Sequence, residues 1–178
     1  LFRSFVGAAL VGEAGAKIID IHQHTQYWGR SDEDLVRHQR ALGITKTVLL
    51  PAGSRYGLEA ECYGNDSVVA MAKRYPRDFH FFANEDPSLP EAIAVIEKYL
   101  KAGAIGIGEQ KFFVECDSEY VRRLAELAAG YGVPILLHFQ HGKYNTSFER
   151  FHKVLERHPR VNFIGHAQTM WGNIDRNH

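Results

Sequence analysis

The chain has 178 residues, of which 45% are hydrophobic and 12% aromatic, so it is long and apolar enough to form one domain with a sizeable core. Its 21 basic and 21 acidic residues balance, and they form no basic stripe of the kind that binds a phosphate backbone. Composition therefore excludes a disordered chain and argues against nucleic acid as a partner. No apolar run reaches the length of a membrane span, about 18 residues or more.

Residues 1–16 precede the first expected strand and read LFRSFVGAALVGEAGA. An apolar stretch that ends in Ala14, Gly15 and Ala16 resembles the end of a secretory signal with its small-residue cleavage site, although Arg3 is its only basic residue. The alternative is an N-terminal arm that packs on the domain. The sequence therefore leaves two locations for the protein, the cytoplasm or, after export, the periplasm.

Six short apolar runs of strand-like composition follow and alternate with amphipathic helical stretches. Their starts recur every 25 to 33 residues, and the runs cover 17–21, 46–50, 79–83, 104–108, 133–137 and 161–165. This spacing predicts repeated βα units with parallel strands. Such units build either an open doubly wound sheet or a closed eight-stranded barrel.

Helix starts between these strands carry capping signatures, in which Ser31, Ser88 or Thr146 is followed three residues later by an acid. The stretch 118–131 has apolar residues at the spacing of a helix with one buried face. The sequence therefore places amphipathic helices between the strands.

Two features favour the barrel over the doubly wound sheet. No strand is followed by a Gly-rich phosphate loop, which weakens the dinucleotide-binding architecture. Polar residues capable of chemistry follow most of the strands instead, including the Asn84, Glu85, Asp86 triplet after the third. Because barrel enzymes build their sites on that rim, we predict an α/β fold of the (β/α)8 TIM-barrel type, here incomplete with about six βα units.

The first strand ends in an unusual pair of histidines, within IIDIHQHTQYWG at 18–29. Strand side chains alternate between faces, so Asp20, His22 and His24 share one side. Imidazole is costly at a buried position unless it has polar partners. We therefore predict that His22 and His24 bind a common metal ion.

Three later strands end in further candidate ligands. His138 ends PILLH and His166 follows VNFIG, each at the last position of a buried strand. Glu109 follows AIGIG, whose glycines at 106 and 108 leave space on the inner face of the strand, and we expect its carboxylate to join the histidines. Lys111 shares that face and is the alternative bridging group if it is carbamylated, whereas Gln110 points to the other face.

Three loop residues are candidates for substrate contact. His141 is interpreted as a second-layer group, a substrate contact or an exposed loop residue. Trp28 and Trp171 follow ligand motifs and could form aromatic walls for a substrate or pack beneath their loops. The cysteines, Cys62 and Cys116, are too few for a paired-cysteine zinc site.

The motifs DIHQH, GIGEQK, ILLHFQH and VNFIGHAQTMWGN, in this order at successive strand ends, resemble the metal-dependent amidohydrolase superfamily, in particular its amidohydrolase-related branch. The resemblance covers about residue 17 to the C-terminus and implies a hydrolase barrel domain over 17–178. It further implies that His22 and His24 bind one divalent ion, that the fourth-strand residue bridges or binds, and that the two later histidines serve the same ion or a second one.

That superfamily also carries an aspartate at the end of the eighth strand, which binds metal and handles the proton of the attacking water. Six strands are found here, and Asp175 lies in a Gly- and Asn-rich loop, so no catalytic residue is assigned. We expect the chain to be a C-terminally truncated piece of a longer reading frame. Such a piece is by itself a poor candidate for a stable catalyst, because an unclosed barrel exposes strand edges.

Imidazoles with a carboxylate suit one or two divalent ions, zinc first, with manganese, iron or nickel as alternatives. We expect a metal-dependent hydrolase, in which metal-activated water attacks an amide, lactone or other ester of a small molecule. The resemblance leaves a metal-dependent non-oxidative decarboxylase or hydro-lyase as the alternative. A non-catalytic metal-binding remnant domain is the second alternative, and homo-oligomer formation is left open.

Overall fold

The computed structural model describes residues 17–53 and 62–174, so the interpretations of 1–16 and of Asp175 lie outside the described residues. Its strands are β1 (Ile18–Gln23), β2 (Ile44–Leu49), β3 (Phe79–Phe81), β4 (Ile107–Gln110), β5 (Ile135–His138) and β6 (Phe163–His166). Its α-helices are α1 (Asp32–Ala41), α2 (Asn65–Arg74), α3 (Ala92–Lys101), α4 (Glu119–Tyr131), α5 (Phe151–Arg157) and α6 (Gln168–Ile174). Two short 3-10 helices, η1 (Tyr27–Gly29) and η2 (Phe148–Arg150), follow β1 and precede α5.

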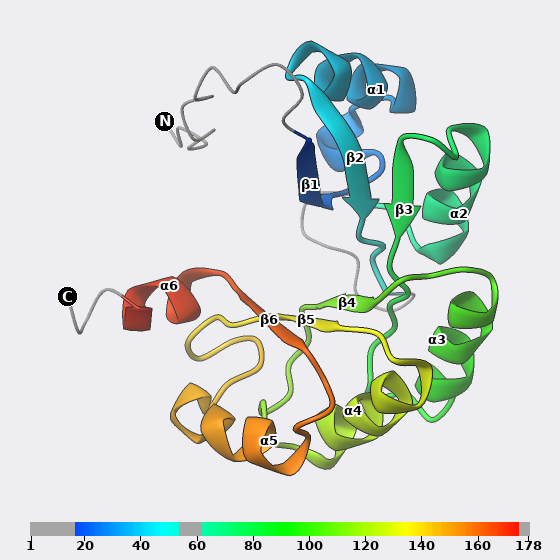
Figure 1. Ribbon diagram of the computed structural model, residues 1–178. Coiled ribbons are helices and arrows are strands. Elements are labelled where there is room, and N and C mark those ends of the chain that lie inside the picture. Colours follow the sequence, from blue (N-terminus) through cyan, green and yellow to red (C-terminus); the bar gives the residue numbers. More distant parts are fainter. Residues whose placement is uncertain (1–16, 54–61, 175–178) are drawn as a thin grey trace.

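The strands form two parallel three-stranded sheets in sequential order, β1-β2-β3 and β4-β5-β6. A parallel bridge between Ala83 and Ile107 joins the end of β3 to β4. Figure 1 shows the strands following one another around an arc, with α2, α3, α4 and α5 along its outer side. Sequential order and helices on one side confirm the predicted α/β barrel-type fold with six βα units and exclude the doubly wound sheet.

The core lies between the sheets and the outer helices. Its fully buried side chains come from both layers and include Leu49, Val68, Ile96, Ile107, Leu124, Ala128, Ile135 and Leu137. This packing fixes the strands against the helices and so fixes the positions of the strand tips. No helix among the described residues is long and apolar enough to cross a membrane.

All six strands differ from the expected runs by one to three residues at one or both ends, and the differences at β1 and β4 affect the site. β1 reads as a buried strand, but Ile18, Ile19 and Ile21 are 44%, 58% and 49% exposed because, among the described strands, β1 pairs with β2 alone. β4 was expected at 104–108 but runs Ile107–Gln110, since its pairing with β5 continues through Gln110. Glu109 therefore lies within the strand ladder and not beyond it.

The glycines before Glu109 serve packing. A Cβ on Gly106 would lie 2.4 Å from the ring of Phe82, and one on Gly108 would lie 2.7 Å from the carbonyl oxygen of Leu136. The space predicted beside Gly106 is thus filled by Phe82. These glycines let neighbouring strands and side chains approach β4 closely.

The helix caps agree with the sequence at one of the three predicted places. Ser31 caps α1 and accepts a hydrogen bond from the backbone N–H of Asp34 at 3.1 Å. Ser88 does not cap α3, because its hydroxyl donates to Asp86 at 2.7 Å and the helix begins later, at Ala92. Thr146 caps no helix either, since the chain enters η2 one residue farther on.

Candidate metal centre

The tips of β1, β4, β5 and β6 bring four histidines and one carboxylate together. His138 and His166 end neighbouring strands and pair in register. The ring centroids of His22 and His166 lie 4.3 Å apart, those of His22 and His24 lie 5.0 Å apart, and those of His138 and His166 lie 5.2 Å apart. Side chains from the first and last described strands therefore meet at one point.

Glu109 lies at the centre of this cluster and is 3% exposed. Its Oε2 is 3.6 Å from Nε2 of His22 and 3.7 Å from Nε2 of His24. Its Oε1 is 2.5 Å from Nδ1 of His138 and 3.4 Å from Nε2 of His166. Each carboxylate oxygen thus faces its own pair of histidines.

The electrostatics favour neutral imidazoles at His24 and His166 and an ionised carboxylate at Glu109. Burial lowers the pKa of both His24 and His166 to about 4, and this effect outweighs the nearby negative charge of Glu109, which acts to raise both. Burial acts to raise the pKa of Glu109, but its hydrogen bond with His138 and the His22 imidazole 3.6 Å away outweigh burial and hold that pKa well below the usual range. These are the protonation states in which imidazole and carboxylate bind metal.

Two histidines show how the ring nitrogens are oriented. Nδ1 of His24 lies 2.8 Å from the carbonyl oxygen of Leu50, to which it donates, so its Nε2 faces Glu109 as a lone pair. Nε2 of His138 is buried without a hydrogen-bond partner among the described residues. An orphaned buried nitrogen is rare in a protein interior and is expected where a bound group completes the site.

The donor set fits divalent metal. Two groups of three residues each have ligand atoms within 4.8 Å of one another. One group is His22, His24 and Glu109, and the other is Glu109, His138 and His166. An ion with bonds of about 2.0–2.2 Å needs its ligands about 4 Å apart or less, so small movements suffice. Imidazole nitrogen with carboxylate oxygen suits zinc and also manganese, iron or nickel.

The remaining candidates lie outside the cluster. Lys111 is half-buried, and its ammonium group sits 5.4 Å from the ring centroid of Tyr144. Trp171 is 52% exposed with its ring centroid 5.2 Å from that of His166, whereas Trp28 is 68% exposed. Trp171 is therefore placed to form a wall beside the cluster.

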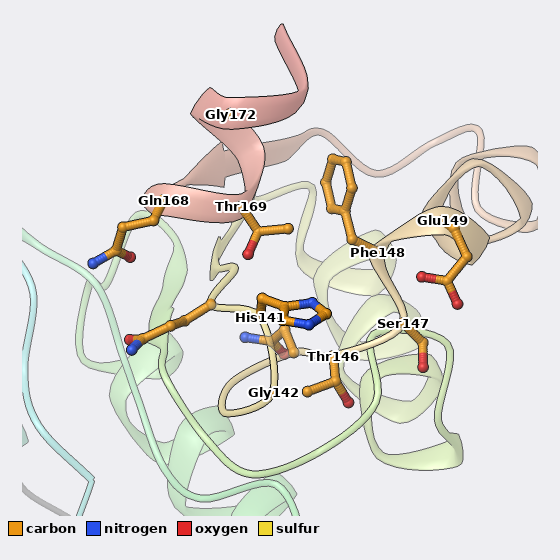
Figure 2. A pocket seen from close by; sticks show the side chains of 11 residues that line it. His141, Gly142, Thr146, Ser147, Phe148, Glu149, Gln168, Thr169 and Gly172 are labelled. Carbon is orange, nitrogen blue, oxygen red and sulfur yellow. The ribbon is translucent and has the colours of Figure 1, made fainter. Parts of the chain in front are cut away.

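His141 is exposed and lines a pocket of about 800 Å³ on the same rim. Figure 2 shows Gln168 and Thr169 of α6 on one side of this pocket, with His141 and Thr146 from the loop after β5 on the other. No lysine or arginine is among the described residues that line it, which are Gln140, His141, Gly142, Asn145, Thr146, Ser147, Phe148, Glu149, Gln168, Thr169 and Gly172. The pocket and the cluster are neighbours in the sequence, because Gln140 lies two residues after His138 and Gln168 lies two residues after His166.

Sequence reasoning missed the buried carboxamides beside the cluster. Asn84 stands out only as one of the polar residues after the third strand, and Gln110 was expected to point away from the site. The side chain of Gln110 is 1% exposed and donates to Asn84. Asn145 has no local signal at all, because its partners are residues 110 and 138.

Comparisons with known proteins identify the fold. No family model and no curated protein matches the sequence. An uncharacterised TIM-barrel protein from Bordetella bronchiseptica matches with a TM-score of 0.68 and 18% identity, over 84% of this chain and 66% of the other. An amidohydrolase II structure matches with a TM-score of 0.59 and 14% identity, over 83% of this chain and 65% of the other.

A 2,6-dihydroxybenzoate decarboxylase in complex with 2,6-dihydroxybenzoate also matches, with a TM-score of 0.58 and 14% identity, over 84% of this chain and 66% of the other. The chain thus spans 65–66% of the length of these three structures. The expected likeness to amidohydrolase-type barrels is confirmed at the level of the fold.

Proposed function

We propose that this chain carries the metal centre of a metal-dependent hydrolase that acts on an amide, lactone or other ester of a small molecule. The observation that carries the proposal is the placement of Glu109, whose two carboxylate oxygens each face a separate pair of histidines. This geometry matches a carboxylate that bridges two ions, and it favours Glu109 over Lys111 as the bridging group. The fold likeness to amidohydrolase II supports the same reaction class.

The residues around the centre have distinct tasks in this proposal. Glu109 supplies the negative charge that would hold the cations, and the four histidines supply the remaining donors, with His24 and His166 kept neutral by burial. A bound divalent ion supplies a Lewis acid, which polarises a carbonyl oxygen and lowers the pKa of water toward neutrality. The carbonyl of Leu50 holds the ring of His24 in the binding orientation.

The pocket beside the centre indicates what kind of substrate group could bind. Among the described residues, its lining offers amide and hydroxyl groups from Gln140, Gln168 and Thr146. A carboxylate substrate would normally be held by a cationic side chain or by the metal itself. These amide and hydroxyl groups suit a neutral polar substrate, such as an amide or lactone.

A non-oxidative decarboxylase is the second candidate, because one of the fold neighbours is a 2,6-dihydroxybenzoate decarboxylase. Five potential ligands, which are His22, His24, Glu109, His138 and His166, are more than a single ion holding a carboxylate requires. The ligand number therefore favours hydrolysis. A metal-binding domain without catalysis is the third candidate.

The test is metal analysis of the full-length protein together with an activity screen. Zinc-loaded and chelator-stripped protein would be assayed against lactones, aryl esters, amides and aromatic carboxylates. We expect hydrolysis that is lost on stripping, restored by zinc and absent in Glu109→Gln. Release of carbon dioxide without hydrolysis would favour the decarboxylase, and stoichiometric metal without any turnover would favour the non-catalytic domain.

A further inference from the structure

A connected row of buried carboxamides lies beside the candidate metal centre. Asn65, Asn84, Gln110 and Asn145 are 8%, 2%, 1% and 1% exposed, and we refer to them as the carboxamide chain. They come from the start of α2, the segment after β3, the end of β4 and the loop after β5. Side chains from four separate segments thus form one polar network in the interior.

Asn84 connects three segments. Its Nδ2 donates to the carbonyl oxygen of Pro51 at 2.9 Å and to that of Glu109 at 2.8 Å, while its Oδ1 accepts from Nε2 of Gln110 at 2.6 Å. Asn65 binds the backbone of Asn84 on both sides, with its Nδ2 donating to the carbonyl at 2.7 Å and its Oδ1 accepting from the N–H at 2.9 Å. The side chain of Asn84 is therefore fixed, and it fixes the backbone of Glu109.

Asn145 does the same on the other side of β4. Its Nδ2 donates to the carbonyl oxygen of Gln110 at 2.6 Å and to that of His138 at 2.9 Å. One amide group thus joins the ends of β4 and β5, where two cluster side chains originate. In β5 the bonded carbonyl belongs to the cluster residue His138 itself. In β4 it belongs to Gln110, the residue directly after Glu109.

We propose that Asn84 and Asn145 are positioning residues, which set the backbone of Glu109 and His138 so that the carboxylate and imidazole stay aligned for metal. The inference rests on the proposed function, because it takes Glu109 and His138 as ligands. A small displacement of β4 would break the arrangement in which the two oxygens of Glu109 face different histidine pairs. Groups that orient metal ligands typically change metal affinity by about 10- to 100-fold when they are altered.

The chemistry of the amide explains why asparagine occupies these positions. Each Nδ2 uses both of its N–H groups on two different carbonyl oxygens. An aspartate has the same shape but no N–H donor. Its oxygen would face the two carbonyl oxygens without a hydrogen bond and would be repelled by them. Asparagine also adds no charge near Glu109.

The experiment compares Asn84→Asp and Asn145→Asp with the wild-type protein and with Ile96→Val. Ile96 is fully buried in α3 and outside the cluster, so Ile96→Val lowers stability without touching the site. Zinc dissociation constants would be measured by competition with a chromophoric chelator, and Co²⁺ absorption spectra would report the ligand geometry. We expect both Asp variants to bind zinc at least about 10-fold more weakly with altered Co²⁺ spectra, and Ile96→Val to match the wild type in both.

Folded Asp variants with wild-type zinc affinity and Co²⁺ spectra would overturn the positioning role and leave the proposed function intact. Failure of the wild type itself to bind zinc would instead remove the proposed function, and the positioning role with it. Side-chain amide hydrogen exchange in the wild type covers the case in which the variants do not fold. We expect zinc to slow exchange at Asn84 and Asn145, and exchange that zinc leaves unchanged would also overturn the positioning role.

Discussion

Replacing Glu109 with glutamine keeps the shape of the side chain and removes its charge and one of its two oxygens. In the native geometry Oε2 serves His22 and His24, and Oε1 serves His138 and His166. A glutamine has a single oxygen, so its amide nitrogen must face one of the pairs as a donor. We therefore predict that Glu109→Gln holds at most one ion where the native protein holds two.

The affinity of any remaining ion should also fall. Altering groups that only orient a ligand costs about 10- to 100-fold in metal affinity, so the loss of a charged ligand should reach at least the upper figure. A 100-fold loss corresponds to about 2.8 kcal/mol. Burial strengthens the argument, because Glu109 is 3% exposed and water cannot easily take the place of the missing oxygen.

The assay is elemental analysis after gel filtration, combined with a competitive zinc titration. Glu85→Gln is the matched control, since Glu85 is also 3% exposed at a strand tip but belongs to neither candidate ligand group. We expect Glu85→Gln to keep the native stoichiometry and affinity. Unchanged metal content and affinity in Glu109→Gln would refute the bridging role and direct attention to Lys111.

Further predictions concern pH and packing. Burial lowers the pKa of His24 and His166 to about 4 from 6.5, so the unfolded chain binds more protons between these values, and the metal-free protein should lose stability as pH falls from about 6.5 to 4. Urea unfolding at several pH values measures this, and an equal pH slope in the His24→Asn, His166→Asn double variant would contradict it. Gly106→Ala should cost about 1–3 kcal/mol, because the new Cβ would lie 2.4 Å from the ring of Phe82. Gly130→Ala in α4, where a Cβ meets nothing within 4 Å, should instead stabilise by about 0.5–1 kcal/mol, and equal unfolding midpoints for the two variants would refute the packing argument.

Local signals in the sequence account for the order of the elements and for the cluster of candidate ligands. The spacing of apolar runs predicts parallel βα units, and the histidines at strand tips share an edge because parallel strands end on the same side. The structure brings those side chains together around Glu109. Their role as metal ligands stays a prediction.

The features that local signals did not predict depend on partners far away in the chain. Nothing near Gly106 shows that the ring of Phe82 fills the space beside it. The capping pattern at Ser88 fails because Asp86 competes for its hydroxyl. Asn145 acts on carbonyls 35 and 7 residues away, so its contribution emerges only once the strands are placed.

The central claim is that the five side chains at these strand tips bind divalent metal, with Glu109 between two histidine pairs. Anomalous diffraction at the zinc absorption edge, from crystals grown with zinc, tests it most directly. We predict two peaks, one bonded to Oε2 of Glu109 with His22 and His24, the other to Oε1 with His138 and His166, at about 2.0–2.2 Å. The absence of any peak within bonding distance of the Glu109 carboxylate would contradict the account.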